Sequence, residues 1–143
     1  MNSIPFSELK IYNYQEIDFP EVDKLMLEIK NFVFIFNETP TEEEISFITK
    51  VAEAIHLDFK KDISHFTLLA NNQLPIRHLR GKSVKYILNF GVNHKQLGLN
   101  IEVLPYKKIQ LLDFNIIFCH PIAIIMQHQN LKKLLWDAIK TIS

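Results

Sequence analysis

The sequence has little cysteine, little glycine and no excess of charge of either sign. Its single cysteine, Cys119, excludes a disulfide framework, a cysteine-rich zinc site and a cysteine-ligated iron–sulfur cluster. Three glycines and six prolines favour long regular elements over a loop-rich β-sandwich. Sixteen basic residues balance sixteen acidic residues, which argues against a protein that binds mainly by neutralising phosphates. We therefore expect little or no direct nucleic-acid binding.

Long apolar runs and targeting signals are also missing. No apolar run approaches the roughly twenty residues that cross a membrane, and no signal-peptide pattern is present. We therefore expect a soluble, cytoplasmic protein with no membrane partner. What the sequence does have is a large apolar share, 48% of its 143 residues, with 11% aromatic residues. This composition predicts one domain with a sizeable core.

The first twenty residues differ from the rest, because neither the helical nor the strand period holds across them. They are rich in apolar and aromatic side chains and carry two prolines. We interpret residues 1–20 as an irregular N-terminal arm and residues 21–143 as a single α/β domain. From composition alone an arm packed along its own domain is favoured, and the alternative is a partner-binding peptide whose aromatic residues anchor it.

The domain begins with the pattern of an α/β unit. Phe32–Phe36 is an unbroken apolar run, typical of a strand buried on both faces of a parallel sheet. A helix is predicted directly after it, with Thr39 and Glu42 at capping-box spacing. Further strands are expected at Phe66–Ala70, Val84–Phe90, Lys107–Leu112 and Ile116–Cys119, and a last helix, capped by Asn130, at Leu131–Ile142. This order predicts a small three-layer α/β/α sandwich with a mostly parallel central sheet.

Polar residues follow the predicted strands at the edge where parallel sheets usually bind ligands. They are Asn37, Glu38, Asn71, Asn72, Gly91, Asn93 and His120. A carboxylate, several amides and an imidazole that converge could orient a water molecule and contact a base or sugar. Polar residues are also what any strand end needs where it reaches solvent, and the residues alone favour this second interpretation.

Other chemical motifs are weak or absent in the sequence. The turn after the first strand, Asn-Glu-Thr-Pro-Thr, has no glycine with which to cradle a phosphate. The six histidines lack metal-binding spacing, so we expect no metal and no cofactor. Cys119 lies in an apolar run and is interpreted as an inert core residue. The basic cluster from Arg77 to Lys85 is most simply a solvated face.

Two stretches resemble the uracil-DNA glycosylase superfamily. Residues 37–43, Asn-Glu-Thr-Pro-Thr-Glu-Glu, stand where those enzymes carry a Gly-Glu-Ala-Pro-Gly type motif after the first strand. Cys119-His120-Pro121 resembles their His-Pro motif, and residues 130–136 resemble the helix behind it. The resemblance implies a uracil-DNA glycosylase-like fold, with Glu38 as the residue that orients water and His120 as a contact to the base.

The sequence departs from that superfamily at both glycines of the first motif, which Asn37 and Thr41 replace. A side chain therefore stands where the family needs bare backbone beside a flipped base. A divergent base-excision glycosylase using Glu38 and His120 is accordingly the alternative interpretation rather than the leading one.

Over nearly its whole length the chain is also similar to the psi subunit family of the bacterial DNA polymerase III holoenzyme, a catalytically degenerate version of the same fold. The likeness lies in the aromatic arm, the strand Phe32–Phe36, the glycine-led strand Lys82–Gly91 and the closing helix around Leu135-Trp136. The resemblance implies an adaptor without catalytic residues. Its N-terminal peptide would dock on clamp-loader subunits, and its globular part would hold a chi-like subunit that contacts single-strand-binding protein.

This second resemblance favours the partner-binding interpretation of the arm. The expected anchors are its apolar and aromatic side chains Phe6, Leu9, Ile11, Tyr12 and Tyr14.

Overall fold

The computed structural model describes residues 29–79, 82–111 and 113–142. The expected arm, with its anchors between Phe6 and Tyr14, lies outside the described residues. Within them, five strands form one sheet: β2 (Phe32–Phe36), β3 (Ile63–Thr67), β4 (Tyr86–Phe90), β5 (Lys108–Leu111) and β6 (Phe114–Cys119). Their order is β3-β2-β4-β6-β5. Only β5 is antiparallel to its neighbour among these strands, so the prediction of a mixed α/β fold with a mostly parallel sheet is confirmed.

Strand β2 lies between β3 and β4, which explains its composition. Its residues from Val33 to Phe36 are buried, with side chains alternating between the two faces. Val33 and Ile35 belong to one core, and Phe34 and Phe36 to the other. An apolar residue is therefore required at every position of this strand.

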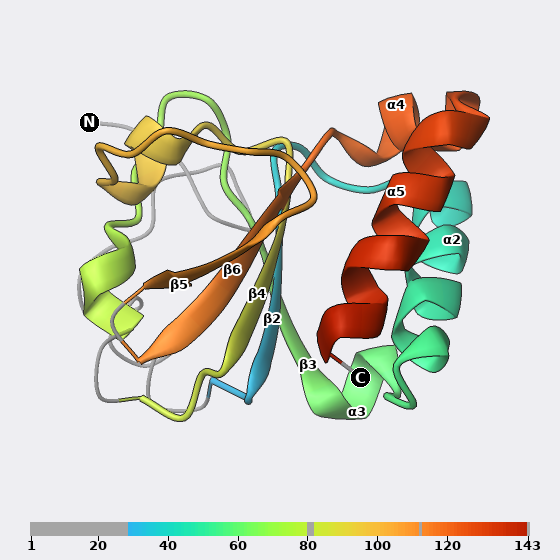
Figure 1. The fold of residues 1–143 in the computed structure, drawn as a ribbon, viewed down its shortest axis with the longest axis horizontal. Coiled ribbons are helices and arrows are strands. Elements are labelled where there is room, and N and C mark those ends of the chain that lie inside the picture. The colour runs from blue at the N-terminus through green and yellow to red at the C-terminus, as the bar shows by residue number, and fades with distance from the viewer. Residues whose placement is uncertain (1–28, 80–81, 112, 143) are drawn as a thin grey trace.

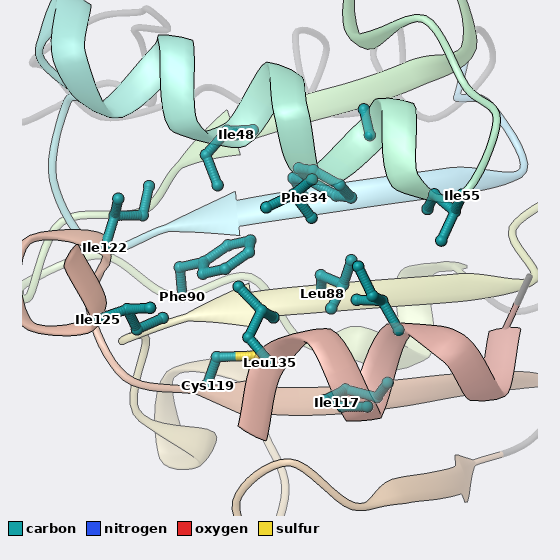
Figure 2. Close-up of a cluster of buried hydrophobic side chains, with 14 of the residues drawn as sticks. Phe34, Ile48, Ile55, Leu88, Phe90, Ile117, Cys119, Ile122, Ile125 and Leu135 are labelled. Carbon is teal, nitrogen blue, oxygen red and sulfur yellow. The ribbon is translucent and has the colours of Figure 1, made fainter. Parts of the chain in front are cut away.

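One face of the sheet is covered by α-helices. Helices α2 (Glu42–Ala54), α4 (Ile122–Gln127) and α5 (Gln129–Ile139) lie together on this side in Figure 1, and the short α3 (Phe59–Asp62) leads into β3. Figure 2 shows Ile48 of α2 and Leu135 of α5 pointing at the phenylalanines of β2 and β4. Phe34 and Phe90 meet edge to face with ring centroids 5.7 Å apart, and Leu135 is fully buried. This core holds the helices in place through the buried stripes expected from the sequence.

The opposite face is covered differently. Here the described residues contribute the 3₁₀ helices η1 (Ile76–Leu79) and η2 (His94–Leu97) and the loops around them (Figure 1). Their buried residues Leu74, Leu79 and Leu97 pack against Val33, Ile35 and other residues of the sheet. The described part of this layer thus consists of short helices and loops that carry a second core.

Several predicted element boundaries are wrong, including the starts of β4 and β6 and the end of α5. Helix α2 begins two residues later than expected, with Thr41 as its N-cap and Glu44 completing the capping box. Residues 37–40 are needed to cross from the sheet to the helix layer. Strand β3 begins at Ile63 rather than Phe66, because parallel pairing places Ile63 beside Phe32. The last helix is capped by His128, whose carbonyl accepts bonds from the third and fourth residues after it, so Asn130 lies inside the first turn.

A short 3₁₀ helix, η3 (Lys140–Ile142), follows α5. In the described residues no helix is both long and apolar enough to cross a membrane.

Candidate functional site

The topology marks one place as the candidate site. From β2 the chain continues to β3 on one side, and it then returns past β2 to form β4 on the other side. In open parallel sheets ligands usually bind at such a reversal, outside the carboxyl ends of the strands. Asn37 follows β2 and Gly91 follows β4, so these two residues stand at the crevice.

Side chains occupy the space directly over Gly91. Gly91 has a φ of +88°, and a Cβ at this position would lie 2.8 Å from Cγ of Pro121 and 3.0 Å from Cγ of Asn37. The two strand ends are also joined by a backbone hydrogen bond, because the Asn37 N–H donates to the carbonyl of Phe90 at 3.2 Å. Asn37 and Pro121 therefore both pack closely against Gly91.

The two residues expected to carry catalysis are in different surroundings. Glu38 is exposed and does not line the adjacent pocket. His120 is half-buried and lines a pocket of about 240 Å³ between the ends of β4 and β6. The pocket is lined by Gly91, Val92, Asn93, His94, Val103, Pro105, Phe118, Cys119, His120 and Pro121. Of the polar residues predicted at this edge, the pocket brings together Asn93 and His120 with Gly91.

The remaining predicted residues, Asn71 and Asn72, lie in the loop after β3. The amide of Gln96 on η2 donates to the carbonyls of Leu69 at 2.8 Å and Asn72 at 3.0 Å. These bonds tie the loop to the second layer. Neither Asn71 nor Asn72 lines the pocket that contains His120.

His120 is held by Tyr106, which the sequence did not single out. The Tyr106 hydroxyl lies 2.8 Å from Nδ1 of His120 and accepts the His120 backbone N–H at 3.3 Å, while the two rings stack with centroids 5.5 Å apart. Burial raises the pKa of Tyr106 to about 12, so the phenol keeps its proton at neutral pH. The two hydrogen bonds and the stacked rings together fix the orientation of the His120 imidazole.

Tyr106 occupies a strained backbone position. Its φ is +63°, and the Lys107 N–H donates to the Leu104 carbonyl at 3.3 Å. With Pro105 at the second position, this is the pattern of a type II turn, whose third position usually takes glycine. A bulky residue there costs about 1 kcal/mol or more and persists only where its contacts outweigh the strain. The bonds to His120 and the burial of the ring supply those contacts.

Asn89 is the second residue that sequence patterns missed, because it is hidden within an apolar strand. It is fully buried, and its side chain donates to the Val92 carbonyl and accepts the Val92 N–H, both at 2.9 Å. These two bonds shape the turn that places Val92 and Asn93 at the pocket. The sequence did carry a signal for this turn, namely an asparagine near the end of an apolar strand and two residues before Gly91. A buried amide needs hydrogen-bond partners, and the backbone of the following turn is the nearest source of them.

The chemistry available at this edge is limited. Cys119 is buried, and burial raises the pKa of its thiol, which disfavours the reactive thiolate form. Across residues 29–79, 82–111 and 113–142 no three histidine, cysteine or acidic side chains are arranged to hold a metal ion. The site offers one oriented imidazole and a mainly apolar wall. Neither a protein-family model nor a curated protein sequence matches the chain.

Proposed function

We propose that the protein is a non-catalytic adaptor, similar to the psi subunit of the bacterial DNA polymerase III holoenzyme, which acts in the cytoplasm on clamp-loader subunits. The observation that carries the proposal is the packing of Asn37 over Gly91. A uracil-DNA glycosylase-like framework needs open space at this point for a flipped base. Here the glycine of the first motif is replaced by Asn37, whose side chain occupies the space over Gly91.

The proposal includes a fold, namely a uracil-DNA glycosylase-like sandwich that has lost its active site, and the order of the elements supports it. Glu38 follows the first described strand, and His120-Pro121 follows the last parallel strand, in the order that the resemblance implies. Glu38 is exposed, and the wall around His120 is mainly apolar. A catalytic pair would need both groups at one bound substrate.

In this proposal the arm binds the partner. Its aromatic and aliphatic anchors, from Phe6 to Tyr14, would become ordered in a groove of a clamp-loader subunit and supply most of the binding energy. The near-zero net charge agrees with recognition through apolar anchors rather than through a nucleic-acid backbone.

The test compares the tagged full-length protein with a form that starts at Glu21, both used to capture proteins from native cell lysate. Clamp-loader subunits should be captured by the first and lost from the second. Circular dichroism and thermal unfolding of the shorter form show that its domain is still folded. Equal capture by both forms would refute the role of the arm, and no capture of any replication protein would refute the adaptor assignment.

A divergent glycosylase is the alternative, and the ordered Tyr106–His120 pair is the observation that favours it. A buried partner that fixes an imidazole beside a pocket is a common feature of binding sites. The assay is uracil excision from single-stranded and duplex DNA, with Glu38→Ala and His120→Ala as controls. Excision that both substitutions abolish would replace the adaptor proposal with this alternative.

A further inference from the structure

Strand β5 forms an edge of the described sheet, and its pairing determines which backbone groups it exposes. Leu111 pairs with Phe114 and Ile109 with Ile116 across the hairpin. In antiparallel pairs, residues that bond to the partner strand alternate with residues whose N–H and C=O point away from it. The closing pair of a two-residue hairpin is bonded, so Leu111 and Ile109 bond to β6. The N–H and C=O groups of Lys108 and Gln110 therefore point away from the sheet.

The register at the other end of β5 agrees with this assignment. The Tyr106 N–H donates to the Phe118 carbonyl at 2.9 Å. Phe118 therefore belongs to the same bonded set as Ile116 and Phe114, two and four residues before it. The strained turn at Tyr106 fixes where β5 begins, and so fixes which of its residues face outward.

The two sides of this edge differ in polarity. Ile109 and Leu111 are only partly buried against the core under η1 and η2, where Leu99, Ile101 and Val103 are partly buried as well. Leu104, which directly follows Val103 in the chain, is 56% exposed, and it is the most exposed large apolar residue of the described chain. On the helix side Lys108 is exposed and reaches the Thr141 carbonyl at 3.4 Å. Lys107, directly before it, is also exposed.

We propose that β5 binds an extended segment of a partner protein that alternates apolar and acidic residues. Such a segment would add a sixth strand to the described sheet through the outward backbone groups of Lys108 and Gln110. Its apolar side chains would cover Ile109, Leu111 and the neighbouring apolar strip. Its acidic side chains would lie on the helix side beside Lys108, where cross-strand pairs of opposite charge are favourable.

Charge argues for an acidic partner rather than a second copy of this chain. A second β5 would bring further lysines to the same edge, and like charges on adjacent strands are unfavourable. Edge strands that must stay unpaired commonly carry lysine for this reason. The same lysines accept a strand of complementary charge.

The inference extends the proposed adaptor function by giving the globular domain its own docking surface, separate from the arm. Its test uses the full chain and two acetylated seven-residue peptides, Glu-Val-Glu-Val-Glu-Val-Glu and Lys-Val-Lys-Val-Lys-Val-Lys. Binding is followed by amide chemical shifts. The acidic peptide should shift the amides of residues 107–111 and 99–103, and the lysine peptide should not.

Gln110→Pro is the decisive variant. It removes an outward N–H that β6 does not use, so the hairpin should stay folded while the added strand loses a hydrogen bond and meets the proline ring. We expect the affinity for the acidic peptide to fall about tenfold or more. Gln110→Ala keeps the N–H, and its affinity should stay within about twofold of the parent protein. Lys107→Glu with Lys108→Glu should reverse the preference toward the lysine peptide.

A second comparison leaves the protein unchanged, in case Gln110→Pro does not fold. An acidic peptide with Pro-Pro at its centre cannot continue a strand and should not bind. The proposal is overturned if both peptides bind equally, if the proline peptide binds as well as its parent, or if Gln110→Pro and Gln110→Ala bind alike. It is also overturned if the full chain forms a dimer that Gln110→Pro dissociates, since the occupant is then a second copy. If the full chain captured no clamp-loader subunit, this peptide binding would be unchanged, so the two proposals can fail separately.

Discussion

Asn89→Leu tests whether the buried amide holds the turn that leads to the pocket. Leucine branches at Cγ as asparagine does, so the substitution removes the hydrogen bonds while keeping the outline of the side chain and adding some volume. The Val92 N–H and carbonyl both lose their side-chain partner, and Val92 is only 4% exposed, so water does not readily replace it.

The expected cost follows from those two groups. Each buried polar group left unpaired costs about 1–3 kcal/mol, and the more apolar side chain recovers part of this. We expect the free energy of unfolding to fall by about 2–4 kcal/mol. A domain of this size has about 5–15 kcal/mol in total, so the variant should remain folded at room temperature.

The assay is equilibrium urea unfolding followed by circular dichroism. With a slope of about 2 kcal/mol per M, the urea midpoint should fall by about 1–2 M. The matched control is Asn71→Leu, an exposed position at which the same chemical change should cost within about 0.5 kcal/mol. Asn89→Asp should be at least as damaging as Asn89→Leu, because a carboxylate cannot donate to the Val92 carbonyl and its charge would be buried. A loss below about 1 kcal/mol for Asn89→Leu would refute the reasoning.

Three further predictions concern the same edge and the second core. Gly91→Ala should destabilise the protein by about 1–3 kcal/mol in urea unfolding, because the new Cβ would lie 2.8 Å from Cγ of Pro121 and the φ of this residue is +88°. A neutral result would show that Asn37 and Pro121 move aside easily. Tyr106→Phe should cost about 1–2 kcal/mol by the same measurement and change the ring resonances of His120, and unchanged resonances would contradict the bond to Nδ1. The ring of His65 stacks on Phe59, and partial desolvation there lowers its pKa although the residue is still exposed, so the unfolded chain binds the proton more readily. The contribution of His65 to the free energy of unfolding should be complete above about pH 6.5 and should decrease as the pH falls below that value. His65→Gln should lose less stability over the same pH range. An equal loss in both proteins would contradict the role of His65.

The parts of the fold that were predictable are those with a strong local pattern. The run Phe32–Phe36 predicted a strand buried on both faces, and it forms an interior strand of the described sheet, between β3 and β4. The stripe that includes Leu135, Ala138 and Ile139 likewise predicted the buried face of α5. In both cases the apolar pattern coincides with residues that pack into a core, so the local sequence was sufficient.

Element boundaries were less predictable because tertiary contacts set them. Thr39 and Thr41 both precede a glutamate by three residues, and the choice of Thr41 as N-cap follows from how far residues 37–40 must cross. Strand β3 contains His65 and Ser64, which interrupt its apolar pattern, and pairing with β2 determines its start. Local sequence gives no information about that pairing.

The candidate site also has features that local sequence predicts and features that depend on tertiary contacts. Sequence position correctly placed His120 and Gly91 at the carboxyl edge, because strand ends follow from strand assignment. It could not show that Tyr106, fourteen residues before His120 in the chain, reaches across to it. Nor could it show that Asn37 packs onto Gly91, since that contact depends on the sheet order.

The most direct measurement is the equilibrium binding of the full chain to purified clamp-loader subunits by biolayer interferometry. The parent protein is compared with a variant in which the arm residues Phe6, Leu9, Tyr12 and Tyr14 are alanine, and with Glu38→Ala. The adaptor account predicts that the arm variant loses binding by about 100-fold or more, since each anchor contributes about 1–2 kcal/mol, while Glu38→Ala binds as the parent does. Equal binding by the arm variant, or no binding by the parent protein, would contradict the account.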